Sequence, residues 1–596
     1  MWFAFFMISI FCVLFAGVFS VSVNAGRTVR RRKLSYFNCL FAGVFAASFF
    51  MFIPTHFSAA EASFLGGIRA VLLSLYNAVQ VFAFGCDFKN VYESMPPCPD
   101  ALDLVYQIWV SLIFVVAPIF TFGFVLSLFK NLSEYLRYLR AYFSDVYVFS
   151  ELNEKSVALA ADIKKNNKRA VVVFTDVFEN NDENNYELVE QAKNLGAICF
   201  KNDILVVNFK RHSADKAIFF FTVGKNETEN LNQALKLIET YKDRENTHLY
   251  IFSTKIESEL LLTAVDKGKI KARRVNEVQS LVNRILYKNG EIIFETAKEA
   301  DNGEKRISAV VIGMGNHGTE MVKALAWYGQ MDGYRLEINA FDKDELAMEK
   351  FVALAPELMS ADYNGVYVDG EAQYLINIHS GVDVDTNSFA QKISGLTDTT
   401  YVFVALGNDD VNINTAVRLR MYFERMKIHP VIQAVVYNSR QKNALEKIKN
   451  YRGQAYDIDF VGDIETSYTA DVIIDSELEE DALKRHLKWG NEEEFWTYEY
   501  NYRSSMASAI HMKARIKCGI PGADKAEDDL TENERDIIEA LEHRRWNAYM
   551  RSEGYVFSGS KDKSSRNDLA KMHHDLVDFA SLTDEEKRKD SRIGTN

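Results

Sequence analysis

The chain has 596 residues, which is too long for one compact domain. Its formal charge of −13 argues against nucleic acid as the main partner, because a phosphate backbone needs a basic face to bind. The six cysteines include no C-x-x-C pair, so neither a zinc site nor a disulfide scaffold is indicated, and we predict no metal.

The chain begins with an apolar region that predicts membrane spans at residues 2–23, 36–55 and 104–129. A signal peptide is the alternative for the first run, but it would need a positive segment before the apolar stretch. Basic residues follow the first run at 27–33 and the last run from Lys130. The positive-inside rule therefore predicts a multi-pass protein of the cell membrane, with the N-terminus outside and residues after about 130 in the cytoplasm.

Residues 61–85 are also apolar, but a fourth full span would put one basic cluster on the wrong side of the membrane. This segment carries Arg69, Asn77 and Gln80, and polar residues at membrane depth usually face protein or a water-filled path. We predict a re-entrant helix that enters from outside. An amphipathic helix lying in the interface is the alternative.

The order of outer helix, re-entrant helix, loop and inner helix resembles that of potassium channels. Residues 76–88 (YNAVQVFAFGCDF) loosely follow that family's pore helix and filter, although the T-V-G-Y-G filter sequence is missing. The resemblance implies a pore in a homotetramer, with membrane lipid and inorganic ions as partners, and it leaves ion selectivity open. The candidate pore residues are Phe82, Ala83, Phe84, Gly85, Asp87 and Gly123.

After residue 140 the pattern changes to short apolar runs that alternate with helical stretches, which predicts doubly wound parallel sheets. Strands are expected at 145–150, 169–176, 196–203, 216–223 and 248–254, and a second series begins at Ile307 and continues near 401–406, 431–436 and 458–461. The stretch from Ala217 to Leu231 parallels that from Tyr401 to Ile413, which indicates an internal repeat.

The most informative stretch opens the second series. Gly313, Gly315 and Gly318 follow an apolar run at G-x-G-x-x-G spacing, and a second apolar run ends at Asp342. Such glycines permit a tight turn, a close backbone approach to a pyrophosphate and helix-on-strand packing, while the acid suits a ribose. A Rossmann-type unit is therefore predicted. Its cleft binds a nucleotide or, alternatively, serves only as an assembly platform.

The two series resemble tandem RCK (TrkA-N) domains, at residues 145–295 and 305–480. In that family, paired domains form a gating ring, and ligands in their clefts change its shape. The first copy has Glu151, Asn153 and Ser156 in place of the glycine pattern, so we expect it to be structural. The expected nucleotide-binding residues of the second copy are Gly313, Gly315, Asn316, His317, Gly318, Asp342 and Asp410. For His317 the alternative is an exposed loop histidine, and for Asp410 it is helix capping.

The alternation of strands and helices ends near Leu483, and helices are expected at 503–517, 531–554 and 569–582. Thr531 and Glu534 predict a capping box. The run Glu542-His543-Arg544-Arg545-Trp546 and the later His573-His574 resemble the RyR domain, over residues 485–592. That resemblance implies a sensor of nucleotide-derived signals. The candidate ligand residues are Trp496, Arg503, Glu542, His543, Arg545, Trp546 and His573, while an internal ion pair of Glu542 with Arg545 is the alternative.

The sequence thus predicts a multi-domain membrane protein with an α-helical transmembrane pore region, two α/β Rossmann-like domains and a mostly helical RyR-like domain. The leading hypothesis is a channel opened by a nucleotide or nucleotide-derived signal, acting as a prokaryotic antiviral effector. The alternative is a housekeeping potassium channel or transport regulator that senses NAD(H) or ATP/ADP. No catalytic acid–base set accompanies the glycine turn, so an oxidoreductase ranks last and we expect no enzyme.

Overall fold

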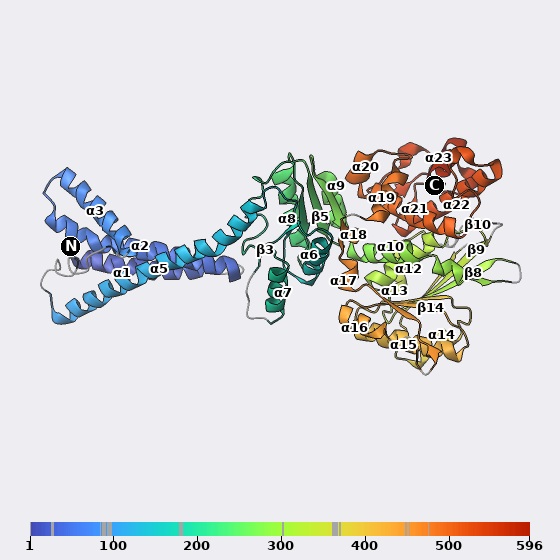
Figure 1. Ribbon diagram of the computed structural model, residues 1–596, viewed down its shortest axis with the longest axis horizontal. Helices are drawn as coiled ribbons and strands as arrows, with labels where there is room; N and C mark the ends of the chain where they lie inside the picture. The colour runs from blue at the N-terminus through green and yellow to red at the C-terminus, as the bar shows by residue number, and fades with distance from the viewer. Residues whose placement is uncertain are drawn as a thin grey trace. The chain divides into compact units, whose positions relative to one another are not determined.

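The computed structural model describes residues 2–24, 29–83, 85, 91, 98–177, 183–300, 303–359, 367–368, 371–372, 374–447, 450–451, 453–474 and 476–595. These residues separate into two compact units, Met1–Arg137 and Tyr138–Asn596, and each is described by itself. In Figure 1 the first unit is blue, and the second runs from cyan to red.

The first unit is a bundle of apolar helices. They are α1 (Trp2–Asn24), α2 (Val29–Ala59), α3 (Phe64–Phe82) and α5 (Asp100–Arg140), the last of which runs past the unit's end. Side chains that point outward include Phe11, Phe64 and Val115, all more than half exposed. A bundle with apolar side chains on its outside is better suited to a lipid environment than to water.

Some polar side chains inside this bundle are paired across helices. The Trp109 indole N–H donates to Ser9 Oγ (2.9 Å), whose hydroxyl donates to the carbonyl of Ala47 (2.9 Å). Asn77 Nδ2 and His56 Nε2 lie 2.8 Å apart and join α3 to α2. These bonds connect α5, α1, α2 and α3 where water is scarce, which is how helices are held together in membranes.

Within the described residues, four helices, rather than the three predicted spans, are long and apolar enough to cross a bilayer. The additional helix is α3, whose 19 residues lie inside the predicted re-entrant segment. Its last residue, Phe82, is buried against the rings of Phe41 and Phe45, and Ala83 N–H donates to Gln80 O as the helix ends. Gly85 N–H donates to the same carbonyl at 3.0 Å.

The structure says less about the other candidate pore residues. Gly123 lies within α5, whereas Phe84 and Asp87 fall outside the described residues. The described part of the loop therefore continues the end of a helix, and a row of extended backbone carbonyls is not seen in Phe82, Ala83 or Gly85.

The second unit begins with a six-stranded sheet in which all strands are parallel, in the order β3-β2-β1-β4-β5-β6. Phe149 stacks between Phe174 and Phe221 at centroid distances of 5.3 and 4.7 Å, so aromatic rings form the centre of its core. The strands are β1 (Val146–Phe149), β2 (Val171–Phe174), β3 (Ile198–Cys199), β4 (Ile218–Thr222), β5 (Thr247–Phe252) and β6 (Lys271–Val275). The helices are α6 (Glu154–Asn166), α7 (Glu183–Asn194), α8 (Glu227–Tyr241), α9 (Ile256–Ala264), α10 (Glu277–Asn289) and α11 (Ile292–Glu295).

The second sheet has the same order when its strands are counted along the chain. It reads β12-β9-β8-β13-β14-β17, all parallel, and β7 (Lys298–Glu299) adds antiparallel to β8. The strands are β8 (Lys305–Ile312), β9 (Tyr334–Phe341), β12 (Tyr374–His379), β13 (Tyr401–Val404), β14 (Val431–Val435) and β17 (Ile458–Val461). Its helices are α12 (Asn316–Tyr328), α13 (Ala347–Leu354), α14 (Asn387–Ser394), α15 (Asp409–Arg425) and α16 (Ser439–Leu445). Two short hairpins pair β10 (Tyr367–Val368) with β11 (Glu371–Ala372) and β15 (Asn450–Tyr451) with β16 (Gln454–Ala455).

Equivalent asparagines mark the repeat that the sequence predicts. Asn230 accepts from Gly224 N–H and donates to the carbonyl of Phe252 on the neighbouring strand. Asn412 does the same in the second copy, with Leu406 N–H and the carbonyl of Val435. One buried amide thus joins two strand ends in each sheet, which satisfies backbone groups that would otherwise be costly to bury.

A connector returns from the second sheet to the first. It contains α17 (Ile464–Ser467) and α18 (Ala470–Ile473), and Ala470 N–H donates to Asp162 of α6 at 2.8 Å. Tyr468, Ala470 and Ile473 join the first sheet's apolar core. The chain then enters the C-terminal region.

The C-terminal region is mostly helical. It comprises α19 (Glu477–His486), α20 (Glu492–Thr497), α21 (Glu499–Lys517), α22 (Glu532–Ser552) and α23 (Asp584–Gly594), with 3₁₀ turns η1 (Glu527–Asp529), η2 (Lys563–Ser565) and η3 (Phe579–Ser581). The predicted capping box is present, since Thr531 and Glu534 bond each other's backbone at the start of α22.

The helix predicted at 569–582 is wrong. That stretch holds strand β19 (Met572–His573), which pairs with β18 (Val556–Phe557), followed by η3. Lys571 adopts a φ of 51°, which a helix does not permit, and its N–H bonds back to Asp568.

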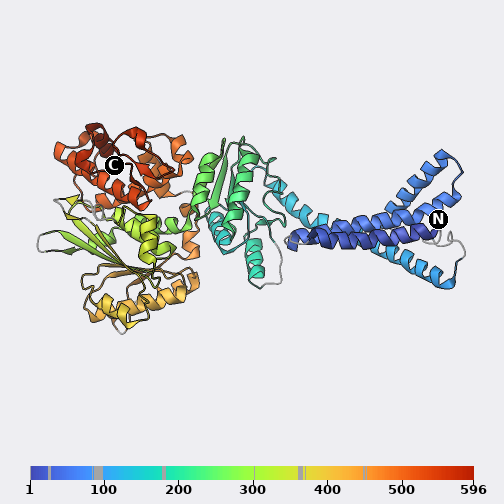
Figure 2. The same ribbon diagram turned by 180° about the vertical axis from the view of Figure 1, so that it is seen from behind.

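One apolar core joins the second sheet to the C-terminal region. Leu325 and Met321 of α12 pack in the same cluster as Leu541 and Met550 of α22, and Ile510 of α21. Figure 1 shows α21 and α22 lying along α12 and α10, and Figure 2 shows the same arrangement from behind. Because this burial is continuous, the second sheet and the C-terminal region form one packed body.

This shared core predicts coupled loss of stability. Leu541→Ala removes a fully buried side chain and should cost about 2–5 kcal/mol. Hydrogen exchange on the detergent-solubilised chain should accelerate in both α12 and α22. Leu569→Ala, at an 82% exposed position in the same region, is the control and should change neither helix. Faster exchange confined to α22 would contradict a common core.

Candidate functional site

The glycine turn after β8 has three glycines in three different surroundings. A Cβ on Gly318 would lie 1.7 Å from the carbonyl oxygen of Gly313, so helix and turn touch there. Gly313 has a φ of +92°, and a Cβ on it would lie 2.5 Å from Ala405 O. A Cβ on Gly315, by contrast, would have no other atom within 4 Å. Two glycines are therefore needed for packing, and the third leaves backbone accessible to a ligand.

Helix α12 begins at this turn without a side-chain cap. A helix that lacks such a cap presents free N–H groups and the positive end of its dipole, which suits an anion. The first copy differs, because Asn153 and Ser156 form a capping box at the start of α6 and Glu151 accepts from Lys225 N–H. Its helix N-terminus is thus satisfied by its own side chains, as expected for a structural copy.

Asp342 lies at the end of β9 and lines the same cleft. Its carboxylate accepts from Met314 N–H at 2.5 Å and from Asp344 N–H at 2.7 Å. The acid therefore holds the glycine turn in place. The sequence suggested a direct contact with a ribose, but in this structure both carboxylate oxygens already have backbone partners.

The cleft beside the turn has a volume of about 630 Å³ and is built by three parts of the second unit. From the second copy come Met314, Gly315, Asn316, Thr319, Glu320, Lys323, Asp342, Asp344, Ala347, Lys350, Phe351 and Leu354. The first copy adds Thr254, Ile256, Glu259, Arg274, Asn276, Val278 and Gln279, and the C-terminal region adds Arg503, Ser552, Glu553 and Lys571. The glycine turn is thus covered by two other regions of the same chain.

Two predicted nucleotide-binding residues lie elsewhere. His317 is half-buried on the other side of the turn, where Nε2 lies 3.1 Å from the hydroxyl of Tyr437, and burial lowers its pKa. Asp410 accepts from Gln441 Nε2 at 2.9 Å and is not among the residues of the cleft. The helix cap next to it is Asn408, which accepts from Val411 N–H.

A second cavity, of about 210 Å³, lies in the C-terminal region. Five of the seven residues predicted there line it: Glu542, His543, Arg545, Trp546 and His573. Arg503 instead faces the glycine-turn cleft, and Trp496 packs beside Phe495 near the first copy. The sequence motif therefore identifies one real cluster, while two residues assigned to it belong to other surfaces.

Glu542 is held between two buried arginines in this cavity. It forms ion pairs with Arg515 and with Arg545, whose Nη2 lies 2.7 Å from Oε1. Burial alone would raise the pKa of Glu542, but the guanidiniums of Arg545 and Arg515 lower it to about 2. The predicted internal ion pair is thus present, and it involves a third residue that the motif does not contain.

Arg545 also keeps an unused donor. Its side chain is 1% exposed, and Nη1 has no hydrogen-bond partner within the described part of the chain. Trp546 lies edge-on to His573 at 4.9 Å and near-parallel to His543 at 6.0 Å. A buried guanidinium with a free N–H beside an indole is a suitable pair for a ligand that carries both an anion and a flat ring.

His573, His574 and Asp575 lie close enough together to hold a metal by distance alone. The two imidazoles are stacked at 4.6 Å with an interplanar angle of 11°, so their nitrogen lone pairs lie in nearly parallel planes. His573 Nδ1 already accepts from Asp575 N–H at 3.1 Å. Parallel rings cannot both direct a lone pair at one ion, which argues against a metal centre here.

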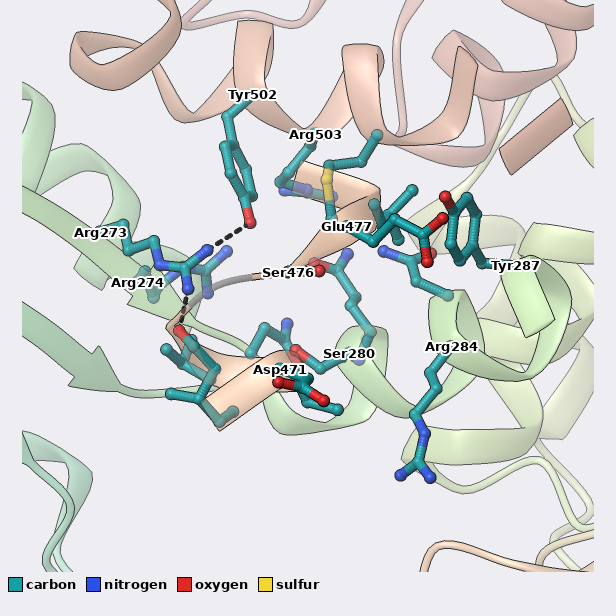
Figure 3. A pocket seen from close by; sticks show the side chains of 18 of the residues that line it. Arg273, Arg274, Ser280, Arg284, Tyr287, Asp471, Ser476, Glu477, Tyr502 and Arg503 are labelled. Atoms are coloured by element: carbon teal, nitrogen blue, oxygen red, sulfur yellow. Dashed lines mark hydrogen bonds between the residues drawn. The ribbon is translucent and has the colours of Figure 1, made fainter. Parts of the chain in front are cut away.

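A third cavity, of about 250 Å³, lies where the first copy, the connector and α21 meet. Figure 3 shows Tyr502 and Arg503 projecting from α21 toward Arg273 and Arg274, while Arg284 points away from them. Arg273 donates to Tyr502 Oη (2.8 Å) and to the carbonyl of Ile473, and it pairs with Glu479. Arg273 thus connects the first copy to the connector and to the C-terminal region. Arg503 lines both this cavity and the glycine-turn cleft.

Sequence reasoning missed several residues of the glycine-turn cleft: Glu320, Lys323, Glu553 and Lys571. A signal existed for Lys323, which follows Glu320 by three residues in the helix that the turn opens. None existed for Glu553 or Lys571, because nothing in their spacing shows that α22 lies over α12.

Adding one methyl group should affect stability differently at Gly318 and at Gly315. Gly318→Ala should destabilise the chain strongly, because the added carbon overlaps backbone. Gly315→Ala should change stability by less than about 1 kcal/mol, since its φ of −69° is ordinary and the space is open. Thermal unfolding of the two variants measures this, and equal melting temperatures would contradict it.

Glu542 predicts a specific dependence on acid. Because its pKa is lowered on folding, the stabilisation it contributes is complete above the ordinary carboxyl value and is lost as the pH falls towards about 2. The difference in melting temperature between wild type and Glu542→Gln should therefore be constant above pH 5 and narrow below it. Glu532→Gln, an exposed change on the same helix, is the control. A difference in melting temperature that stays constant below pH 5 would contradict a lowered pKa of Glu542.

The chain matches no protein-family model, and no curated protein is significantly similar to it.

Proposed function

We propose that this chain is a subunit of a ligand-gated membrane channel, in which a nucleotide or nucleotide-derived molecule binds the second unit and changes the state of the membrane bundle. The subunits form a homotetramer in the cell membrane, and inorganic ions pass between them. The second unit lies in the cytoplasm and contains two RCK-like Rossmann domains and a RyR-like region. A ligand acts as a gating signal only through its different affinity for the two states.

The observation that carries this proposal is the open face of Gly315 at the uncapped start of α12. Both sheets have the strand order 3-2-1-4-5-6, which is typical of dinucleotide-binding folds, and the cleft lies at the carboxyl ends of β8 and β9. The second copy combines this order with an accessible turn, whereas the first copy closes its turn. These features favour the second copy as the nucleotide site of the proposed channel.

The C-terminal cavity supports a role in sensing. Arg545 supplies a buried donor, Trp546 a flat surface and His573 an edge contact. A nucleotide-derived signal offers a phosphate for the first and a base for the second. This chemistry, together with the likeness to RyR domains, favours an antiviral effector whose opening collapses ion gradients.

The membrane bundle supports the transport part of the proposal. Asn77 and His56 pair between α3 and α2, and polar contacts at membrane depth commonly mark ion pathways. The alternative function is a housekeeping potassium channel or transport regulator that senses NAD(H) or ATP/ADP at the glycine turn. An effector is quiet until its signal is supplied, whereas a housekeeping channel supports growth in low potassium.

Ion flux from proteoliposomes containing the full chain tests these roles. With NADH, ATP and ADP as probes, Gly315→Asp should abolish ligand-dependent flux, because a carboxylate at the open position repels phosphate. Gly315→Ala, which adds bulk without charge, should reduce it less. Trp546→Ala tests the C-terminal cavity separately. If none of these probes, nor a cyclic dinucleotide, produces flux or raises the melting temperature, the ligand-gated assignment fails.

A further inference from the structure

A carboxylate of the protein itself lies in the glycine-turn cleft. Glu553 is the C-cap residue of α22, and its side chain pairs with Arg503 and with Lys323 Nζ at 3.3 Å. Lys571 Nζ donates to the backbone carbonyl of the same residue at 2.6 Å. Glu553 and Lys323 are 13% and 14% exposed, so this contact is largely shielded from water.

Glu553 is unfavourably placed with respect to its own helix. The C-terminal end of a helix carries a partial negative charge, which disfavours a carboxylate there. Its position therefore depends on Arg503 and Lys323. Burial opposes the charge of Arg503, but nearby groups including Tyr549, Glu499 and Glu259 outweigh it and raise the pKa of the guanidinium. The cation thus remains charged in the cleft.

The charges around this point are balanced. The cations are Arg274, Lys323, Arg503 and Lys571, and the carboxylates are Glu259, Glu320, Glu499 and Glu553. The ion pairs connect all of them except Lys571, which bonds the backbone of Glu553. A phosphate that arrives at the start of α12 would add negative charge to a neutral, shielded cluster, which is costly unless a resident carboxylate leaves.

We propose that Lys323 and Arg503 form an anion subsite of the glycine-turn cleft and that Glu553 occupies it as a resident anion until a phosphate-bearing ligand displaces it. This inference rests on the proposed function, since it requires that the cleft bind such a ligand. In the bound state Lys323 and Arg503 hold the ligand's terminal phosphate. In the free state Glu553, from the C-terminal region, holds the same two cations and so competes with the ligand.

Glu553 is the carboxylate best placed to leave. Glu320 lies inside α12, where the helix backbone fixes its position beside Lys323, three residues further on. Glu553 ends its helix and is followed by Gly554, whose φ of +84° belongs to a turn. Displacement would also move the end of α22, two turns beyond Trp546, and would therefore reach the C-terminal cavity.

Calorimetric titration of the detergent-solubilised full chain with inorganic pyrophosphate and with ADP tests this. Glu553→Gln retains the shape and removes the competing charge, so pyrophosphate should bind about tenfold more tightly than to wild type, which corresponds to about 1.4 kcal/mol. Glu532→Gln, exposed at the other end of α22, is the matched control and should bind as wild type does. Lys323→Met should weaken binding.

An affinity of Glu553→Gln that equals or falls below that of wild type overturns the proposal. If that variant does not fold, Glu553→Asp serves instead, because retracting the carboxylate by one methylene should tighten binding about two- to threefold; unchanged affinity again overturns it. Gly315→Asp separates the two ideas. If it abolishes binding while Glu553→Gln behaves as wild type, the cleft is a ligand site without a resident anion. If it leaves binding intact, the ligand site itself is misplaced.

Discussion

The packing of α12 against α22 determines the chemistry of this molecule. α12 starts at the glycine turn, and α22 carries both the cluster around Glu542 and the carboxylate of Glu553. Their side chains share one buried core, so the two helices hold a fixed spacing that neither region could maintain alone. Ser552 and Glu553, at the end of α22, reach the glycine-turn cleft through this contact.

The same packing explains how two cavities can influence each other. α21 supplies Arg503 to the glycine-turn cleft and Ser504 to the C-terminal cavity, and α22 contributes to both in the same way. A shift of either helix would therefore change the lining of both cavities. Packed helices shift between discrete positions rather than deforming gradually, so such a link is suited to a switch.

Much of the fold follows from local patterns. Most strands of both sheets, the glycine turn and the capping box of Thr531 were predictable because each depends on residues close together in the sequence. The edge strands β6 and β12 were not among the predicted strands. The cluster of Glu542 with Trp546 was also predictable, since one helix carries both. The location of Arg503 was not, because its partners come from α9, α12 and α22. The backbone contacts of Asp342 and the strand at Met572 likewise depend on tertiary pairing that spacing cannot reveal.

The closed turn of the first copy has a consequence for how the two copies can change over time. Asn153 and Ser156 each satisfy the other's backbone, and Glu151 adds a negative charge close by. No single substitution would reopen that helix start, since removing one partner leaves an unsatisfied amide without creating room for an anion. An open turn in the first copy would therefore need changes at more than one of these three positions.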